Sequence, residues 1–207
     1  MKERDVNNVL EGINDTDIAK IFLFFDFDGQ TISGNHPAKA AEEYIQEMLE
    51  FFSNEDDSSR GKLYISYPMA EAFYHKADKG NMCQGSECHK CFFPARKKYN
   101  NDGINFKKII NDSKAKQKGS VDYFSSSLPF QIQKLKCLVK KDGKVLTAST
   151  YESLCSQNSI LDYQRKYFFP DDQLMILSAF YLFLIDYFGF EKISLQYDEK
   201  ANPRIES

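Results

Sequence analysis

The chain has 207 residues, of which 42% are hydrophobic and 28% are charged, and its formal net charge is −3. This length allows one well-filled core, and this composition excludes a largely disordered chain. The negative charge does not favour a protein that binds nucleic acid with its whole surface, because phosphate neutralisation needs concentrated positive charge. Lysines are locally dense over Lys107–Lys118 and Lys134–Lys144, so a basic face is still compatible with the sequence.

The sequence shows no signal for secretion or for a membrane span. Met1–Asp5 is charged and lacks the apolar segment of a signal peptide. The strongest apolar run, Leu174–Phe188, contains Asp186 and is shorter than the roughly 20 residues that cross a bilayer. Five cysteines, with three in one short segment, do not suit a secreted disulfide framework. We therefore expect a soluble cytoplasmic protein with no membrane partner.

The first third of the chain predicts a strand, a helix and a second strand. Ile21–Phe25 is a continuous β-prone run, which suits a strand covered on both faces. Pro37 suits the first turn of a helix that continues to Phe52. Its apolar positions share one face, and they are Ala41, Tyr44, Ile45, Met48, Leu49 and Phe52.

The second strand is predicted at Lys62–Tyr67, where Pro68 stops it, and Met69–His75 resembles the start of another helix. A strand, a helix and a strand at this spacing predict a βαβ unit with parallel strands. Further helices are predicted at 104–118, 129–140 and 151–169, and a last one at Gln173–Phe188 is ended by Gly189.

The domain organisation follows from these elements. Residues 1–77 form the βαβ core with a polar N-terminal lead, and residues 78–101 form an irregular insert that contains three cysteines. Residues 102–207 form a mainly helical remainder that packs on the same core. The expected fold class is α/β.

Acidic side chains follow both strands of the predicted unit. Asp26 and Asp28 are two residues apart, so on an extended backbone they point to one side while Phe27 points to the other. Glu71 comes just after the second strand. In a parallel sheet these carboxylates gather at one edge, and oxygen ligands of this kind suit Mg²⁺ or Mn²⁺. The alternative is that Asp-x-Asp-Gly simply begins a loop.

The run Ile21–Asp28, followed by a helix and then by Tyr64–Phe73 (Tyr-Ile-Ser-Tyr-Pro-Met-Ala-Glu-Ala-Phe), resembles the central part of a Toprim domain. It is most similar to the versions in OLD-like and RloB-like phage-defence nucleases of bacteria. The resemblance implies a Toprim-like (Rossmannoid) parallel sheet with helices on both faces. It also implies a Mg-dependent hydrolase that cleaves phosphodiester bonds in nucleic acid. Asp26, Asp28 and Glu71 then take the catalytic and metal-binding positions.

The chain departs from this family at its first strand, which should end in Glu-Gly. Glu11-Gly12 imitates that signature, but it lies too close to Asp26 for a parallel crossover. The first catalytic carboxylate is therefore missing. The alternative function is a catalytically inactive Toprim-like binding or regulatory module that acts through a protein partner, and a partner could also complete the site. A third option is a phosphohydrolase of small substrates with Asp26 as its nucleophile.

Cys83, Cys88 and Cys91 have the spacing C-x4-C-x2-C, which allows three thiolates to reach one structural zinc ion. His75 or His89 could supply the fourth ligand. Free cysteines in a reducing compartment are the alternative. Cys137 and Cys155 are expected in the core.

The basic helices could hold nucleic-acid phosphates, and Tyr123, Phe124 and Phe130 could stack on bases, although core packing is the default expectation for these aromatics.

Overall fold

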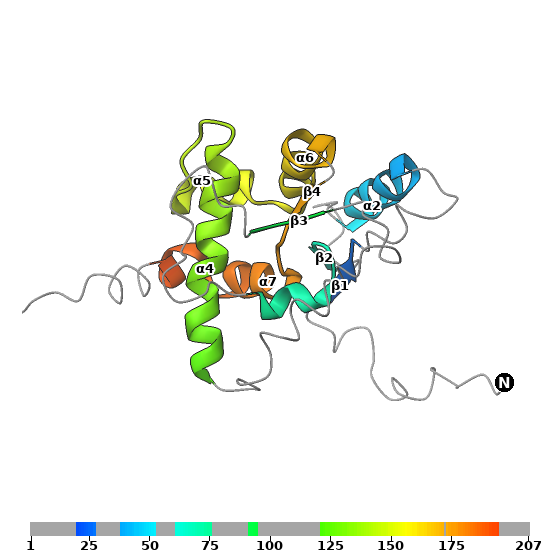
Figure 1. Cartoon of the computed structure of the whole chain (residues 1–207). Helices are drawn as coiled ribbons and strands as arrows, with labels where there is room; N and C mark the ends of the chain where they lie inside the picture. Colours follow the sequence, from blue (N-terminus) through cyan, green and yellow to red (C-terminus); the bar gives the residue numbers. More distant parts are fainter. Residues whose placement is uncertain are drawn as a thin grey trace, which may run out of the picture.

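The computed structural model describes residues 20–27, 38–52, 61–75, 91–94, 121–171 and 173–194 (Figure 1). Several predictions concern residues outside these ranges. They are the helix at 104–118, Glu11, Asp28, His89, Cys83 and Cys88.

Two parallel strands form the N-terminal unit. β1 (Phe22–Asp26) pairs with β2 (Lys62–Ser66) in a register that runs from Phe22 opposite Lys62 to Asp26 opposite Ser66. Helix α2 (Ala38–Phe52) connects them. Gly61 precedes β2 with φ +86°, and a Cβ there would lie 2.8 Å from the Cβ of Ile21. Glycine is therefore required where the two strands begin. The predicted βαβ unit with parallel strands is confirmed.

Helices lie on both sides of this strand pair (Figure 1). Helix α7 (Ala179–Phe188) covers one face, where the ring of Phe183 lies 4.8 Å from Phe22 and 5.8 Å from Tyr64. Helix α2 lies on the opposite side. The expectation that the first strand is covered on both faces is wrong, since Phe24 is 46% exposed and Phe25 is 42% exposed. Within the described part of the chain, β1 is the edge strand of a two-stranded sheet.

A second, antiparallel pair joins β3 (Phe92–Pro94) to β4 (Gln173–Met175). The chain stays extended after β4, and Leu177 exchanges two main-chain hydrogen bonds with Tyr67, of 2.8 and 3.0 Å. The prediction of a helix from Gln173 is therefore wrong, because α7 begins at Ala179. The apolar run Leu174–Leu177 is fully buried, so its side-chain pattern does not distinguish a strand from a helix.

The remaining helices are α4 (Val121–Lys140), α5 (Ala148–Leu154) and α6 (Gln157–Tyr167), with short 3₁₀ turns η4 (Ala70–Tyr74) and η6 (Phe169–Asp171). Two predicted boundaries are wrong. Helix α4 starts upstream and contains Pro129, and the predicted helix 151–169 is divided at Cys155. The division follows from capping, because Ser156 Oγ accepts the amide of Ser159 and starts a new helix.

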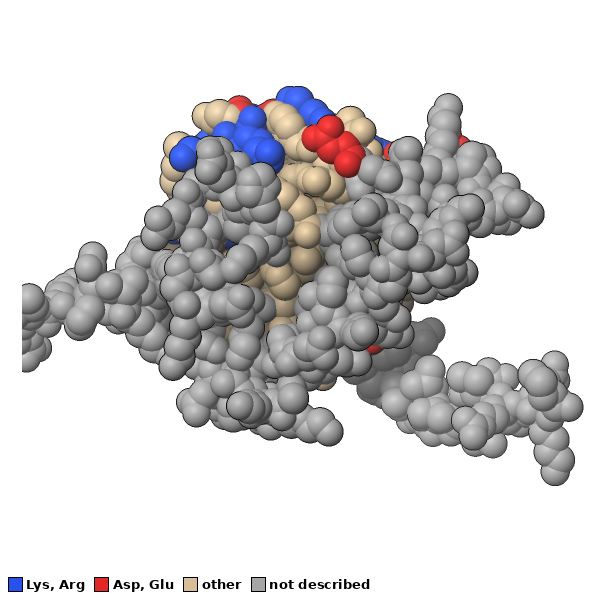
Figure 2. Space-filling model, viewed as in Figure 1, with Lys and Arg blue, Asp and Glu red and all other residues tan. Residues whose placement is uncertain are grey.

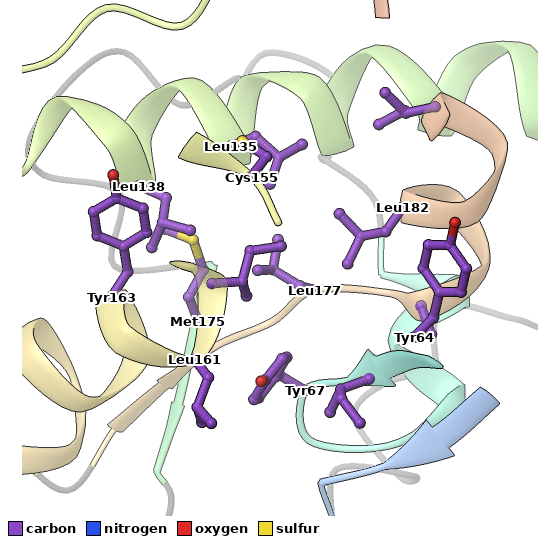
Figure 3. Packing of buried hydrophobic residues seen from close by; sticks show 14 of the residues in the cluster. Tyr64, Tyr67, Leu135, Leu138, Cys155, Leu161, Tyr163, Met175, Leu177 and Leu182 are labelled. Carbon is purple, nitrogen blue, oxygen red and sulfur yellow. The ribbon is translucent and has the colours of Figure 1, made fainter. Parts of the chain in front are cut away.

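One hydrophobic core joins the strand pair to the helices (Figure 3). The four apolar positions predicted for 129–140 are all buried, and they are Ile132, Leu135, Leu138 and Val139. They meet Leu63 and Ile65 from β2, Ile160 and Leu161 from α6, and Leu182 and Ile185 from α7.

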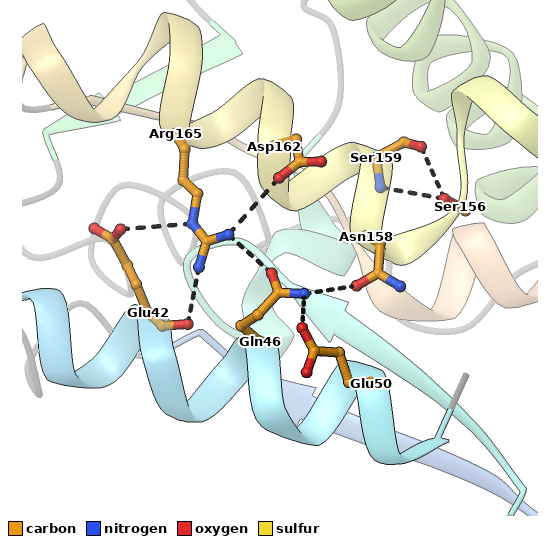
Figure 4. A network of polar contacts seen from close by, with 8 residues as sticks. All are labelled: Glu42, Gln46, Glu50, Ser156, Asn158, Ser159, Asp162 and Arg165. Atoms are coloured by element: carbon orange, nitrogen blue, oxygen red, sulfur yellow. Dashed lines mark hydrogen bonds and ion pairs between the residues drawn. The ribbon is translucent and has the colours of Figure 1, made fainter. Parts of the chain in front are cut away.

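Helix α2 is held to α6 mainly by polar contacts (Figure 4). The Arg165 guanidinium donates to Gln46 Oε1 at 2.8 Å and to the carbonyl of Glu42 at 3.1 Å. Ile45 and Leu49 are buried beneath these contacts, as predicted, but Tyr44 is 65% exposed. The predicted apolar face of α2 is therefore wider than the face it buries.

None of the helices in the described ranges has the length and hydropathy that a membrane crossing needs.

Candidate metal site at the carboxyl end of the strand pair

Asp26 is the last residue of β1 and lies opposite Ser66, the last residue of β2. Side chains alternate along a strand, so Asp26 shares a face with Phe22 and Phe24, which contact α7. Phe27 points to the other face and is buried, with its ring 5.2 Å from Tyr67. This confirms the predicted orientation of Phe27 opposite Asp26. Asp26 itself is exposed.

Glu71 lies in the first turn of η4, shortly after β2. The amide of Ala72 donates to the carbonyl of Met69 at 2.8 Å, which closes this turn. Phe73 stacks on Tyr181 with ring centroids 5.1 Å apart and planes at 11°. The turn that carries Glu71 is thereby held against the first turn of α7.

Helix α7 begins at this same edge of the sheet. The amide of Ala179 donates to Ser66 Oγ at 3.3 Å, and Ser66 is the residue that pairs with Asp26. The N-terminus of a helix carries a partial positive charge and favours anions. Ser66, the strand partner of Asp26, and the turn that carries Glu71 therefore both contact the start of α7 at the carboxyl end of the strand pair.

This arrangement is what the described residues contribute to the predicted metal site. Asp28, the third predicted ligand, lies outside the described residues. In the part of the chain that the structure describes, no three His, Cys, Asp or Glu side chains form a group that could hold a metal ion. The two carboxylates that are described are oxygen donors, so their chemistry fits Mg²⁺ or Mn²⁺.

Two of the four predicted zinc ligands lie near one phenyl ring. Cys91 is fully buried against Phe130, and the ring of His75 lies 5.5 Å from the same ring. Cys83 and Cys88 lie outside the described residues. Burial raises the pKa of the Cys91 thiol to about 11.

Lys134 belongs to the interior, although the sequence placed it on a basic face. Its side chain is fully buried, its Nζ donates to the carbonyl of Ile176 at 2.8 Å, and it lies 4.8 Å from the centre of the Phe130 ring. Burial lowers the pKa of Lys134 to about 7. Its helical spacing from the buried residues Gln131 and Leu138 is the sequence signal that could have indicated this burial.

Phe130 is also buried, which confirms core packing and removes it as a surface for stacking bases. Of the predicted core cysteines, Cys155 is buried and Cys137 is half-buried.

Asp186 is a second acidic centre, and sequence reasoning assigned it no role. Its carboxylate accepts from Tyr151 Oη at 2.7 Å, from Tyr64 Oη at 2.8 Å and from Lys62 Nζ at 2.5 Å. Burial, followed by the neighbouring carboxylate, raises the pKa of both tyrosines. This network lies at the amino end of β2, at the other end of the strand from Ser66. These three hydrogen bonds fasten α7 to β2 and to α5.

The predicted basic face exists at the end of α4. Lys140, Lys141 and Lys144 are exposed there, and Figure 2 shows basic side chains gathered on this side of the described surface. Asp142 accepts from Lys144 at 2.8 Å, from Lys166 at 2.6 Å and from the hydroxyl of Tyr167. These donors hold the pKa of Asp142 well below its usual range.

Comparisons with protein-family models, with curated proteins and with solved structures found no match to this chain.

Proposed function

We propose that the chain is a Toprim-like protein that cleaves phosphodiester bonds in nucleic acid with the help of Mg²⁺, as in bacterial phage-defence nucleases. The observation that carries the proposal is the register of the parallel strands, in which Asp26 lies opposite Ser66. The same edge holds the turn of Glu71 and the start of α7. Ligands bind at the carboxyl ends of the strands in open α/β sheets, which supports a site here.

Asp26 and Glu71 would supply carboxylate oxygens to the metal, together with Asp28, which follows β1 in the sequence. A bound Mg²⁺ would activate a water molecule and stabilise the charge that develops on the phosphate. The start of α7 would orient the anionic phosphate toward this site, because the N-terminus of a helix carries a partial positive charge that attracts anions.

Mutation of the carboxylates tests this function. Asp26→Asn and Glu71→Gln should each lower Mg²⁺-dependent cleavage of labelled DNA or RNA by at least about 100-fold. Both should also weaken Mg²⁺ binding in calorimetric titration. Glu47→Gln is the matched control, since Glu47 is an exposed carboxylate on α2, away from the strand ends. Cleavage that is unchanged in Asp26→Asn would refute the site.

The second candidate is a catalytically inactive module that acts through a protein partner. It is favoured by the aromatic side chains exposed on β1 and α7, where Phe24 and Tyr187 are largely accessible. This candidate expects no Mg²⁺ affinity in the unaltered protein. The same titration therefore separates the two functions.

A further inference from the structure

An exposed aromatic surface runs along α7 and ends at β1. Phe180, Phe183 and Tyr187 recur at helical spacing, and their ring centroids lie 6.2 Å and then 5.5 Å apart. Phe183 also contacts Phe24 on β1, with ring centroids 5.6 Å apart. Tyr187 is 62% exposed and Phe180 is 37% exposed. We call these four residues the aromatic edge.

The α7 part of the aromatic edge is almost free of charge, whereas Asp26 lies on the same face of β1 as Phe24. The ten residues of α7 include one charged side chain, Asp186, and that carboxylate is paired with Lys62. A surface of this kind gives no electrostatic selection for a basic or acidic partner, and it matches another apolar surface. The partner must therefore be apolar along the same length.

β1 adds main-chain groups to this surface. The hydrogen bonds from Lys62 N to the carbonyl of Ile21 and from Phe27 N to the carbonyl of Ser66 direct the odd-numbered residues of β1 toward β2. The main chain of Phe24 therefore faces the outer edge. In the described part of the chain this sheet contains β1 and β2 alone. An edge strand with outward main-chain groups is a template for another strand.

We propose that a second copy of this chain occupies the aromatic edge, with the two β1 strands paired antiparallel about a twofold axis at Phe24. Self-pairing satisfies both requirements at once, because the same apolar, uncharged surface and the same strand edge are then present on each side. In this register Phe24 lies opposite its own counterpart, and aromatic pairs across antiparallel strands are stabilising.

The position of α7 fits this arrangement. Phe183 contacts Phe22 and Phe24 on β1 as well as Tyr64 on β2, so α7 lies over the gap between the two strands. With strands about 4.8 Å apart, the twofold axis would set the two α7 helices two strand spacings, or about 10 Å, from each other. Helices that pack directly are about 8–10 Å apart. Strand pairing and helix packing are therefore compatible in one dimer.

The exposed aromatic area approaches the lower limit of a biological interface. Phe24, Phe180, Tyr187 and the neighbouring Phe188 together expose the equivalent of about two whole aromatic side chains, each about 200 Å². Two copies would bury about 800 Å² from these residues, and the paired main chains bring the interface toward the 1,000 Å² or so expected of a biological contact. In this register Asp26 of one copy lies opposite Phe22 of the other, so the dimer and the candidate metal site share the carboxyl end of β1. The tests of the dimer need no Mg²⁺, so their failure is distinguishable from failure of the proposed function.

Sedimentation of the full chain over a concentration series tests the proposal. We expect a dimer. Phe24→Lys and Tyr187→Lys should each raise its dissociation constant by at least about 30-fold, because each places an ammonium group at an apolar contact. Tyr44→Lys and Phe51→Lys are matched controls, because both replace exposed aromatics on α2. Circular dichroism of every variant checks that it is folded.

A cross-link locates the axis independently of affinity. Opposed residues of a hydrogen-bonded antiparallel pair have Cα atoms about 5.5 Å apart, which is within the range that a disulfide spans. Phe24→Cys should therefore form an intermolecular disulfide under mild oxidation, whereas Tyr44→Cys should not. A monomer at all concentrations would overturn the proposal. So would a dimer that neither lysine variant weakens, since another surface would then hold it together.

Discussion

The two ends of the β1–β2 pair place a carboxylate in different surroundings. At the amino end, Asp186 is surrounded by Tyr64, Tyr151 and Lys62, each of which donates to it. At the carboxyl end, Asp26 is exposed beside Ser66 and the start of α7. The difference is one of exposure, because the Asp186 carboxylate is enclosed by three protein side chains, while Asp26 is exposed to solvent and accessible to a ligand.

Replacing the two acids is the sharpest test of this contrast. Asp186→Ala removes the acceptor of two buried tyrosine hydroxyls, and hydrogen bonds to charged groups contribute about 1.5–3 kcal/mol each. We expect a loss of about 3 kcal/mol in the free energy of unfolding, measured with urea. Asp26→Ala should cost less than about 0.5 kcal/mol, because it is an exposed position. Similar losses for the two variants would break the contrast.

Lys134 is a buried cation, and its burial should make the free energy of unfolding depend on pH. Its pKa is about 7 in the folded chain and about 10.5 when unfolded, so the unfolded chain binds more protons between these values. Stability should therefore rise as pH increases from 7, by about 2–3 kcal/mol up to pH 9. The pKa of Cys91 is raised from 9.0 to about 11, so its opposing contribution begins only near pH 9.

Lys134→Met is the control for this pH dependence, because methionine keeps an unbranched apolar side chain without an ionisable group. Urea unfolding between pH 7 and pH 9 should then give a nearly flat profile. A slope equal to that of the unaltered protein would assign the effect to another group.

The contacts between α2 and α6 should contribute an intermediate amount to the free energy of unfolding, because the side chain of Arg165 is 30% exposed. Arg165→Ala removes the bonds to Gln46 and Glu42, and we expect a loss of about 1 kcal/mol. Asp162→Asn is the control, since Asp162 is 73% exposed and its carboxylate lies 3.7 Å from Arg165 Nη1, which is long for an ion pair. This variant should lower the free energy of unfolding by less than about 0.3 kcal/mol. Equal losses of unfolding free energy in the two variants would mean that burial does not determine how much these contacts stabilise the fold.

Local patterns explain which parts of the fold could be predicted. The helical spacing of Ile45 and Leu49 and of Leu135 and Leu138 identified the buried faces of α2 and α4. Strand alternation correctly opposed Phe27 to Asp26. The exposed side of β1 could not be predicted, because Phe24 and Phe25 have the composition of a covered strand. Likewise, the extended run Leu174–Leu177 depends on partners at Tyr67 and Cys91 that no local pattern contains.

The same limit applies to the candidate site. Asp26 and Glu71 could be identified because each follows a strand closely in sequence. The role of Asp186 could not, because its donors lie on β2 and α5, 122 and 35 residues away. Lys134 was misassigned because its neighbours Lys136 and Lys140 suggested a solvated face, whereas the tertiary packing of α4 buries this one lysine.

The hydrogen bonds along the second edge of β2 have a consequence for synthesis on the ribosome. Ile65 donates to Gln157, 92 residues later, and Ser66 accepts from Ala179, 113 residues later. The ribosome must therefore add 92 and 113 residues after these two positions before β2 can acquire these neighbours. During this interval an apolar strand is available to wrong partners, which exposes the early unit to misfolding.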